Sequence, residues 1–250
     1  MTAYGHEGIT GVTFLSDGNR LVGVLYLARG DVPKPTVLLL HGCPGLEQNL
    51  DIAVALRDCG WNSLVFHYRG CWGSAGRYDL RTITQDVRAA ADHLQQAGYP
   101  GLDPDRLAVA GHSLGGWAAV LAAEADQRLR AVVAMAAPAE LGFASADSEA
   151  LDREFTRFLA VTPAELRRQQ AEIGGWRRPA DVVAAISPRP LLVVHGSADE
   201  WIPAAASRQL YERAGQPRRY VEIDGANHAF AWHRGALRDL VSGWLTETGI

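Results

Sequence analysis

The chain has 250 residues, of which 48% are hydrophobic, so it is long enough to bury the core of one large α/β domain. Its formal net charge of -4 excludes the broad basic surface that binding to nucleic acid or to an anionic membrane needs. We therefore expect a small molecule or a short peptide as partner, and the sequence leaves the oligomeric state open.

The cysteines and the N-terminus indicate the compartment. Cys43, Cys59 and Cys71 are an odd, sparse set without metal-ligand spacing, which argues against a disulfide framework and against a metal site. Whether Cys43 and Cys71 lie close enough to pair stays open. The N-terminal residues lack the cationic start and apolar core of a signal peptide, and the longest uncharged apolar run, residues 131–139, is too short to span a bilayer. We expect a cytoplasmic protein without a membrane partner.

Two apolar runs, residues 12–15 and 21–28, flank a turn signal and predict an N-terminal β-hairpin. After it, short apolar runs alternate with segments of helical period. Runs without polar alternation are typical of parallel strands that are covered on both faces. These runs are residues 36–40, 63–68, 106–110, 131–137, 190–195 and 219–223. The order predicts an α/β fold with a mostly parallel eight-stranded sheet and helices on both faces.

The helix after residue 80 has the clearest end signals. Thr82 and Gln85 predict a capping box, and Gly98 predicts the end of the helix. Arg69, in the loop before this helix, is expected to be structural, with Asp86 on the helix as its candidate partner. Further helices are expected from about Leu114, over 204–214 and over 231–248.

About fifty residues, 138–187, separate two of the predicted strands, which is far more than a usual α/β connection. We expect one domain over residues 1–250 with this segment as a small helical cap. Thr162, Pro163 and Glu165 supply an N-cap, a first-turn proline and a capping-box acid for one of its helices. Four aromatic residues are candidates to line a substrate pocket, although they could also only seal the cap: Trp72, Phe155, Phe158 and Trp176.

The stretch AGHSLGG, residues 110–116, lies between a predicted strand and a predicted helix. Glycines at 111 and 115 fit a very tight turn, because there is no room for side chains two residues to either side of Ser113. Ser113 lies at the carboxyl end of a strand, where open α/β sheets form their ligand sites. We therefore expect a nucleophile here; the alternative is a serine that caps the helix.

A serine hydroxyl is a weak nucleophile unless a base accepts its proton and a third group orients that base. Asp199 follows the run 190–195, and His228 follows the run 219–223, so both come at the same sheet edge as Ser113. We assign His228 as the base and Asp199 as the orienting acid, with Glu200 as the second choice for the acid. Without Ser113 and His228 in the expected order, Asp199 would be interpreted as a turn residue or a helix cap.

The stretches RLAVAGHSLGG, HGSADEWIP and GANHAF, at residues 106–116, 195–203 and 225–230, resemble those of α/β-hydrolase superfamily serine hydrolases. They are most similar to the prolyl oligopeptidase catalytic domain and related esterases. The resemblance extends over nearly all of the chain from about residue 12. It implies the α/β-hydrolase fold, the roles assigned above to Ser113, Asp199 and His228, and a reaction without metal or organic cofactor.

Attack on a carbonyl places negative charge on its oxygen, which needs preorganised hydrogen-bond donors. One is expected to be the backbone N–H of Leu114. The other is expected from the segment HGCPG, residues 41–45, where Cys43 is the natural donor because Pro44 has no N–H. The segment could also be a simple turn. Cys43 as a thiol nucleophile is disfavoured, because it lies in the wrong loop.

We expect a carboxylesterase-like serine hydrolase that forms an acyl-enzyme. A peptidase acting on short peptides or acyl amides is the first alternative. Two readings outside hydrolysis also stay open: a lyase that cleaves a cyanohydrin, which cyanide release would reveal, and a ligand receptor, which would bind a partner without turnover.

Overall fold

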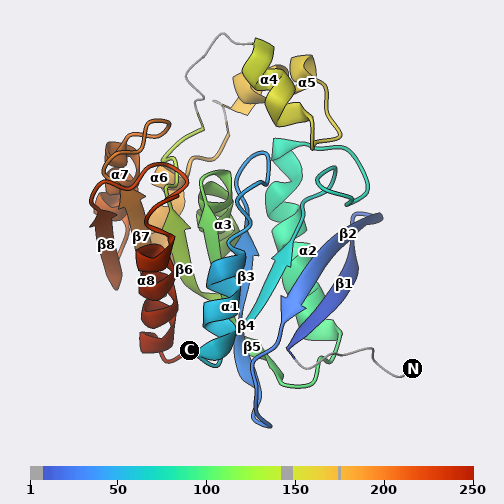
Figure 1. Ribbon diagram of the computed structural model, residues 1–250, viewed down its shortest axis with the longest axis vertical. Helices are drawn as coiled ribbons and strands as arrows, with labels where there is room; N and C mark the ends of the chain where they lie inside the picture. Colours follow the sequence, from blue (N-terminus) through green and yellow to red (C-terminus); the bar gives the residue numbers. More distant parts are fainter. Residues whose placement is uncertain (1–7, 142–148, 174–175) are drawn as a thin grey trace.

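The computed structural model describes residues 8–141, 149–173 and 176–250 (Figure 1). Its first two strands, β1 (Ile9–Ser16) and β2 (Asn19–Tyr26), form the predicted hairpin. Asp17 and Gly18 both have positive φ, as a tight two-residue hairpin turn requires. The sequence prediction of an N-terminal hairpin is therefore confirmed.

The sheet has eight strands in the order β1-β2-β4-β3-β5-β6-β7-β8. The hairpin joins it by antiparallel pairing of β2 with β4, and every following pair is parallel. The six strands after the hairpin are β3 (Lys34–Leu40), β4 (Asn62–Phe66), β5 (Leu102–His112), β6 (Leu129–Met135), β7 (Leu191–Gly196) and β8 (Arg218–Ile223). This is the mostly parallel sheet that the apolar runs predict.

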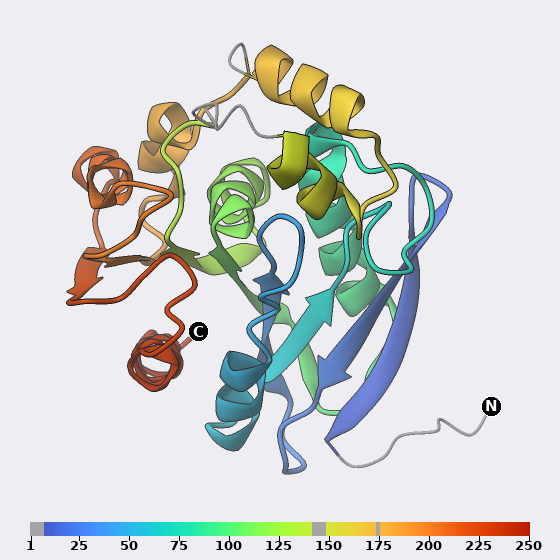
Figure 2. The same ribbon diagram turned by 45° about the horizontal axis from the view of Figure 1, so that its top comes forward.

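The sheet has a hydrophobic core on each face, which explains why its strands are apolar without alternation. In β3, Leu38 and Leu40 belong to one core, and Val37 and Leu39 belong to the other. The first core is covered by α2 (Ile83–Gln96), α3 (Leu114–Ala125) and α7 (Ala204–Arg213), and the second by α1 (Leu50–Asp58) and α8 (Arg234–Glu247). Figure 2 shows the two groups of helices on opposite sides of the sheet.

The start of α2 differs from the prediction. A 3-10 turn, η1 (Leu80–Thr82), precedes the helix, and the Thr82 side chain makes no capping bond to it. The Thr82 hydroxyl instead donates to the Asp79 carbonyl at 2.9 Å, and Gln85 Oε1 accepts from Arg69 Nη2 at 2.9 Å. The predicted capping box is wrong because Arg69, distant in sequence, takes the Gln85 side chain. Gly98 does end the helix, with φ +63°.

Arg69 has the structural role that the sequence predicts. Its Nε and Nη2 donate to Asp86 Oδ1 at 2.9 and 2.7 Å, and its backbone N–H donates to Asp86 Oδ2 at 2.9 Å. Asp86 is fully buried, so the pair anchors the loop after β4 to α2 from within the protein.

The segment between β6 and β7 contains α4 (Glu149–Thr156), α5 (Pro163–Glu172), α6 (Pro179–Val182) and the 3-10 turn η3 (Val183–Ile186). The capping box of Thr162 and Glu165 is present at the start of α5. In Figure 1, α4 and α5 lie beyond the carboxyl ends of β3 and β4. Residues 142–148 and 174–175, within the predicted cap 138–187, lie outside the described residues. That the whole segment caps a substrate site stays a prediction.

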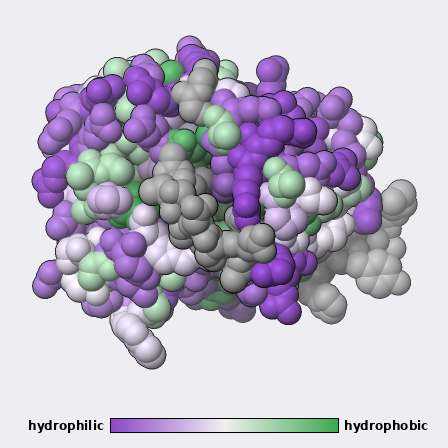
Figure 3. Space-filling model, turned by 90° about the horizontal axis from the view of Figure 1, so that it is seen from above, coloured by the Kyte–Doolittle hydropathy of each residue, from purple (hydrophilic) through white to green (hydrophobic). Residues whose placement is uncertain are grey.

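The outer face of this end of the molecule is mostly polar, with apolar residues between the polar ones (Figure 3). Among the helices of the described ranges, none combines the length and the hydropathy needed to cross a bilayer.

Candidate active site

Ser113 lies in a strained turn between β5 and α3. Its backbone has φ 56° and ψ -121°, and its side chain makes no capping bond to α3. A Cβ at Gly111 would lie 2.1 Å from the Gly115 carbonyl oxygen, and a Cβ at Gly115 would lie 2.3 Å from the Leu40 carbonyl oxygen. Both glycines are therefore required by close backbone packing. The helix-cap alternative for Ser113 is not what the structure contains, and the hydroxyl is free for another partner.

Ser113, His228 and Asp199 form a hydrogen-bonded chain. His228 Nε2 lies 3.1 Å from Ser113 Oγ, and His228 Nδ1 lies 2.8 Å from Asp199 Oδ2. An ionised carboxylate only accepts hydrogen bonds, so we assign the imidazole proton to Nδ1. Nε2 then carries the lone pair that can accept the proton of the serine hydroxyl. The loops after β5, β7 and β8 thus bring these three side chains together at one edge of the sheet.

Asp199 is held as a buried anion. Its side chain is fully buried, and its Oδ1 accepts the backbone N–H groups of Trp201 and Ile202 at 2.9 and 2.8 Å. Burial by itself raises the pKa of the carboxyl, but hydrogen bonds from His195, His228 and the Ile202 backbone outweigh burial and hold the pKa well below its usual range. Glu200, the second choice for the acid, accepts the His228 backbone N–H, at 3.4 Å, and makes no hydrogen bond to the His228 ring among the described residues.

His112 supports the loop that carries His228. Its Nε2 donates to the His228 carbonyl at 2.7 Å. Burial, with His228 close by, lowers the pKa of His112 to about 3, so its ring is neutral near pH 7. The neutral His112 ring therefore donates to the His228 backbone and adds no positive charge beside the His228 imidazole.

Trp201 is a residue of this site that the sequence analysis missed. Its indole lies parallel to the His228 imidazole, with ring planes 6° apart and centroids 5.5 Å apart. The only signal in the sequence is an aromatic residue two positions after Asp199, in the same loop. That signal says nothing about where the ring points.

The segment after β3 lies against the nucleophile. A Cβ at Gly42 would be 3.1 Å from Ser113 Cβ. Leu114 is the first residue of α3, so its N–H has no partner within the helix. Burial raises the pKa of the Cys43 thiol to about 12, which keeps the thiol protonated and argues against its use as a nucleophile. The oxyanion role of the Cys43 and Leu114 N–H groups stays a prediction.

Of the four predicted pocket residues, two form a stacked pair. Trp72 and Phe158 have centroids 4.5 Å apart and planes 5° apart, and Trp72 Nε1 donates to the Pro44 carbonyl at 2.8 Å. Phe155, from α4, meets Trp201 edge to face at 5.8 Å. Trp176 packs against the core that α2 and α3 cover. Contact of these side chains with a substrate stays a prediction.

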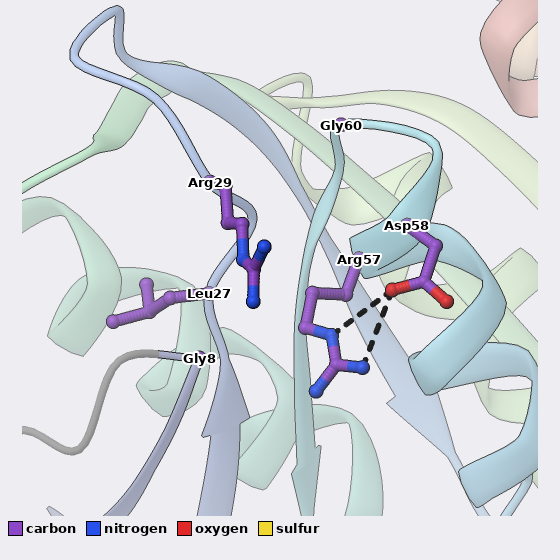
Figure 4. A pocket seen from close by; sticks show the side chains of 6 residues that line it. All are labelled: Gly8, Leu27, Arg29, Arg57, Asp58 and Gly60. Atoms are coloured by element: carbon purple, nitrogen blue, oxygen red, sulfur yellow. Dashed lines mark hydrogen bonds and ion pairs between the residues drawn. The ribbon is translucent and has the colours of Figure 1, made fainter.

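A separate hollow of about 380 Å³ lies near the carboxyl end of β2 and the amino end of β4, at the sheet edge opposite the one that carries Ser113. It is lined by Gly8, Leu27, Arg29, Arg57, Asp58 and Gly60 (Figure 4). Arg57 is paired with Asp58 there, at 3.2 Å. This hollow is remote from the hydrogen-bonded chain and supplies no group to it.

Comparison with known proteins shows which family the chain belongs to. The model of the prolyl oligopeptidase family matches residues 53–245. The chain belongs to the prolyl oligopeptidase family. The matched residues of this family member include the turn at Ser113 and the loops that carry Asp199 and His228. The hydrolase class expected from the sequence motifs is thereby confirmed.

A related protein, the uncharacterized Rv2307c of Mycobacterium tuberculosis, is 31% identical over 242 residues, which cover 94% of this chain and 78% of that protein. Two solved structures share the fold. GrgF, an alpha/beta hydrolase of Penicillium, is 19% identical with a TM-score of 0.75 and covers 95% of this chain and 96% of its own. Est1E of Butyrivibrio proteoclasticus, with bound ferulic acid, is 21% identical with a TM-score of 0.75 and covers 94% of this chain and 98% of its own. The α/β-hydrolase fold is thus confirmed.

Proposed function

We propose that this prolyl oligopeptidase family member is a serine hydrolase that cleaves carboxylic esters, with Ser113 as nucleophile, His228 as base and Asp199 as orienting acid. The observation that carries the proposal is the hydrogen-bonded chain, at 3.1 Å from Ser113 to His228 and 2.8 Å from His228 to Asp199. These distances lie within the reach that proton transfer to a positioned base requires.

In the first half of the reaction, Ser113 Oγ attacks the ester carbonyl carbon while its proton passes to His228 Nε2. The carbonyl oxygen becomes negative and accepts hydrogen bonds from the backbone N–H groups of Leu114 and Cys43. His228, now an imidazolium, is stabilised by the Asp199 carboxylate. When the tetrahedral intermediate collapses, the ester C–O bond breaks and His228 returns the proton to the leaving alcohol. The acyl group stays on Ser113.

In the second half, a water molecule takes the place of the alcohol. His228 Nε2 accepts a proton from the water while its oxygen attacks the acyl carbon. Collapse of this intermediate breaks the bond to Ser113 Oγ, and His228 returns the proton to the serine. The products are the carboxylic acid and the regenerated enzyme. The ferulic acid bound in Est1E is a carboxylic acid, the product that cleavage of an ester or an amide releases, so it supports a carboxylic acyl group in the substrate.

Amide cleavage is the second candidate, because the family that the chain belongs to is named for a peptidase. The same hydrogen-bonded chain would act on an amide, with an amine in place of the alcohol as the leaving group. The two candidates differ in the substrates that are turned over, so one panel of substrates separates them.

The first experiment is labelling by a fluorophosphonate, with Ser113→Ala as the comparison. We expect the wild type to be labelled and Ser113→Ala not to be; labelling that persists in the variant would refute the nucleophile. His228→Ala is expected to lower kcat by about 10⁴ or more, as in other triads.

The second experiment compares p-nitrophenyl esters of graded acyl length with aminoacyl p-nitroanilides. Ester turnover alone supports the esterase and measures the preferred acyl chain. Efficient anilide cleavage favours the peptidase. Turnover of neither class, with intact labelling, favours the receptor or the lyase, which partner binding and cyanide release then distinguish.

A further inference from the structure

The loop between β7 and α7 holds Trp201 rigidly beside the catalytic groups. The Trp201 backbone N–H donates to Asp199 Oδ1 at 2.9 Å, and the next N–H, of Ile202, donates to the same oxygen at 2.8 Å. The carboxylate that orients His228 therefore also fixes the position from which the indole extends. Because the backbone of Trp201 is fixed in this way, its indole can bind a ligand with little loss of conformational entropy.

The indole is supported on two sides and still open to solvent. Its plane is parallel to the His228 imidazole within 6°, and Phe155 of α4 meets it edge to face at 5.8 Å. Even so, 55% of Trp201 is exposed. Aromatic surface that is rigid, exposed and next to reacting groups is suited to stack on a flat apolar group.

The direction of proton transfer defines which part of an ester meets this ring. His228 must return its proton to the leaving oxygen, so that oxygen lies within hydrogen-bond reach of Nε2. The acyl carbonyl oxygen faces the other way, toward the Leu114 and Cys43 N–H groups. The Trp201 ring lies parallel to the His228 ring, with 5.5 Å between the centroids, so the alcohol part is the part of the ester that we expect nearest to the indole. Trp72, which donates to the Pro44 carbonyl, lies beside the segment after β3 instead.

We propose that Trp201 binds the leaving alcohol of the substrate by stacking, and that the enzyme prefers esters of arylmethyl alcohols to esters of saturated alcohols of the same size. The inference rests on the proposed esterase function. It assigns a substrate class to the leaving-group side of the site and makes Trp201 a specificity-determining residue.

The test compares the benzyl and cyclohexylmethyl esters of one acid, chosen as the acyl chain that is cleaved fastest in the p-nitrophenyl series. Acid release is followed by pH-stat titration, and the measured quantity is the ratio of kcat/KM for benzyl over cyclohexylmethyl. The two alcohols have similar size and the same attachment. The difference in their intrinsic reactivity is the same for every variant, so it cancels when the ratios of variants are compared.

We expect Trp201→Leu to lower this ratio about threefold to tenfold, the range that one aromatic contact supplies. A general loss of activity from disturbing His228 affects both esters and leaves the ratio unchanged. Trp201→Phe retains a ring and is expected to recover part of the ratio. Trp232→Leu is the matched control, because Trp232 is 93% exposed and stands outside the hydrogen-bonded chain.

A ratio that is unchanged in Trp201→Leu, while both esters are still hydrolysed, would overturn this inference and leave the esterase standing. An equal fall in Trp232→Leu would also overturn it. If the wild type hydrolyses neither these esters nor the p-nitrophenyl esters, the proposed function fails and the inference fails with it.

Discussion

His195 Nε2 lies 3.1 Å from Asp199 Oδ2, the oxygen that also accepts the hydrogen bond from His228. Nε2 of His195 lies 2.8 Å from the Ile202 carbonyl as well, so it must carry the proton, because both partners only accept. On the other side of the ring, Nδ1 lies 2.7 Å from Ser207 Oγ. The acid of the proposed triad is thus held between two imidazoles, and the second of them is anchored in the core.

Removing this second imidazole should destabilise the fold. His195→Phe takes one donor from a buried carboxylate, and we expect the free energy of unfolding to fall by about 1–3 kcal/mol. His195→Gln places an amide N–H at a similar reach and should recover part of the loss. Urea unfolding of the two variants measures the difference; equal losses in both would mean that packing of the ring, and not its donor, is what matters.

The roles of the two adjacent acids can be separated by kinetics. Asp199→Asn replaces the acceptor of His228 Nδ1 with an amide that favours the wrong tautomer, so kcat should fall by about 10⁴. Glu200→Gln changes a side chain that accepts a backbone N–H at 3.4 Å, so kcat should change little. Steady-state kinetics on the best p-nitrophenyl ester decide this, and the opposite ranking would exchange the two roles.

The tight turn at Ser113 should tolerate no side chain at position 115. The Cβ of Gly115→Ala would lie 2.3 Å from the Leu40 backbone oxygen, so we expect a loss of more than about 3 kcal/mol, beyond ordinary overpacking. Gly243→Ala is the control: the position is exposed in α8, and a Cβ there meets nothing within 4 Å. That change should stabilise the protein by up to about 1 kcal/mol through helix propensity. Thermal unfolding compares the two, and a stable Gly115→Ala would contradict the packing argument.

The buried ion pair of Arg69 and Asp86 should matter far more than an exposed one. Arg69→Met leaves Asp86 fully buried without its cation, and we expect a loss of about 3–5 kcal/mol. Arg77→Met breaks the pair with Glu165, in which the Arg77 side chain is 69% exposed, and should cost at most about 1 kcal/mol. Chemical denaturation measures both, and similar losses would contradict the assignment of Arg69 as the anchor.

The free energy of unfolding should decrease as the pH is lowered below about 7, because histidines that are buried and neutral in the fold take up protons on unfolding. Burial lowers the pKa of His41 from 6.5 to about 3, the Gly42 carbonyl opposes this, and His67 adds to it. Below pH 6.5 His41 is protonated in the unfolded chain but still neutral in the folded protein, so it favours unfolding more and more until the pH reaches about 3.

His41→Asn keeps a donor for the Gly42 carbonyl but removes this titration. Between about pH 6 and pH 4, the slope of unfolding free energy against pH should shrink by about 1.4 kcal/mol per pH unit. Urea unfolding at several pH values tests this; an unchanged slope would mean that His41 is not the group involved.

Local signals in the amino-acid sequence were enough to predict most of the framework of the fold. The sequence predicts the runs that form β3 to β8 and the tight turn at Ser113, because periodicity and glycine sterics act over a few residues. It also predicts the order of Ser113, Asp199 and His228. Parallel strands place their carboxyl ends at one edge, so the convergence of three loops followed from the same local evidence.

Contacts between side chains from distant parts of the chain could not be predicted in this way and are seen in the folded structure alone. Arg69 binds the Gln85 side chain, which therefore does not form the expected capping box. His195 contacts Asp199, four residues after it, and the Trp201 ring is parallel to the His228 ring. Each of these contacts depends on the path of a loop and on the rotamer of a long side chain. A local pattern specifies neither, because burial and competing partners are set by the packed fold as a whole.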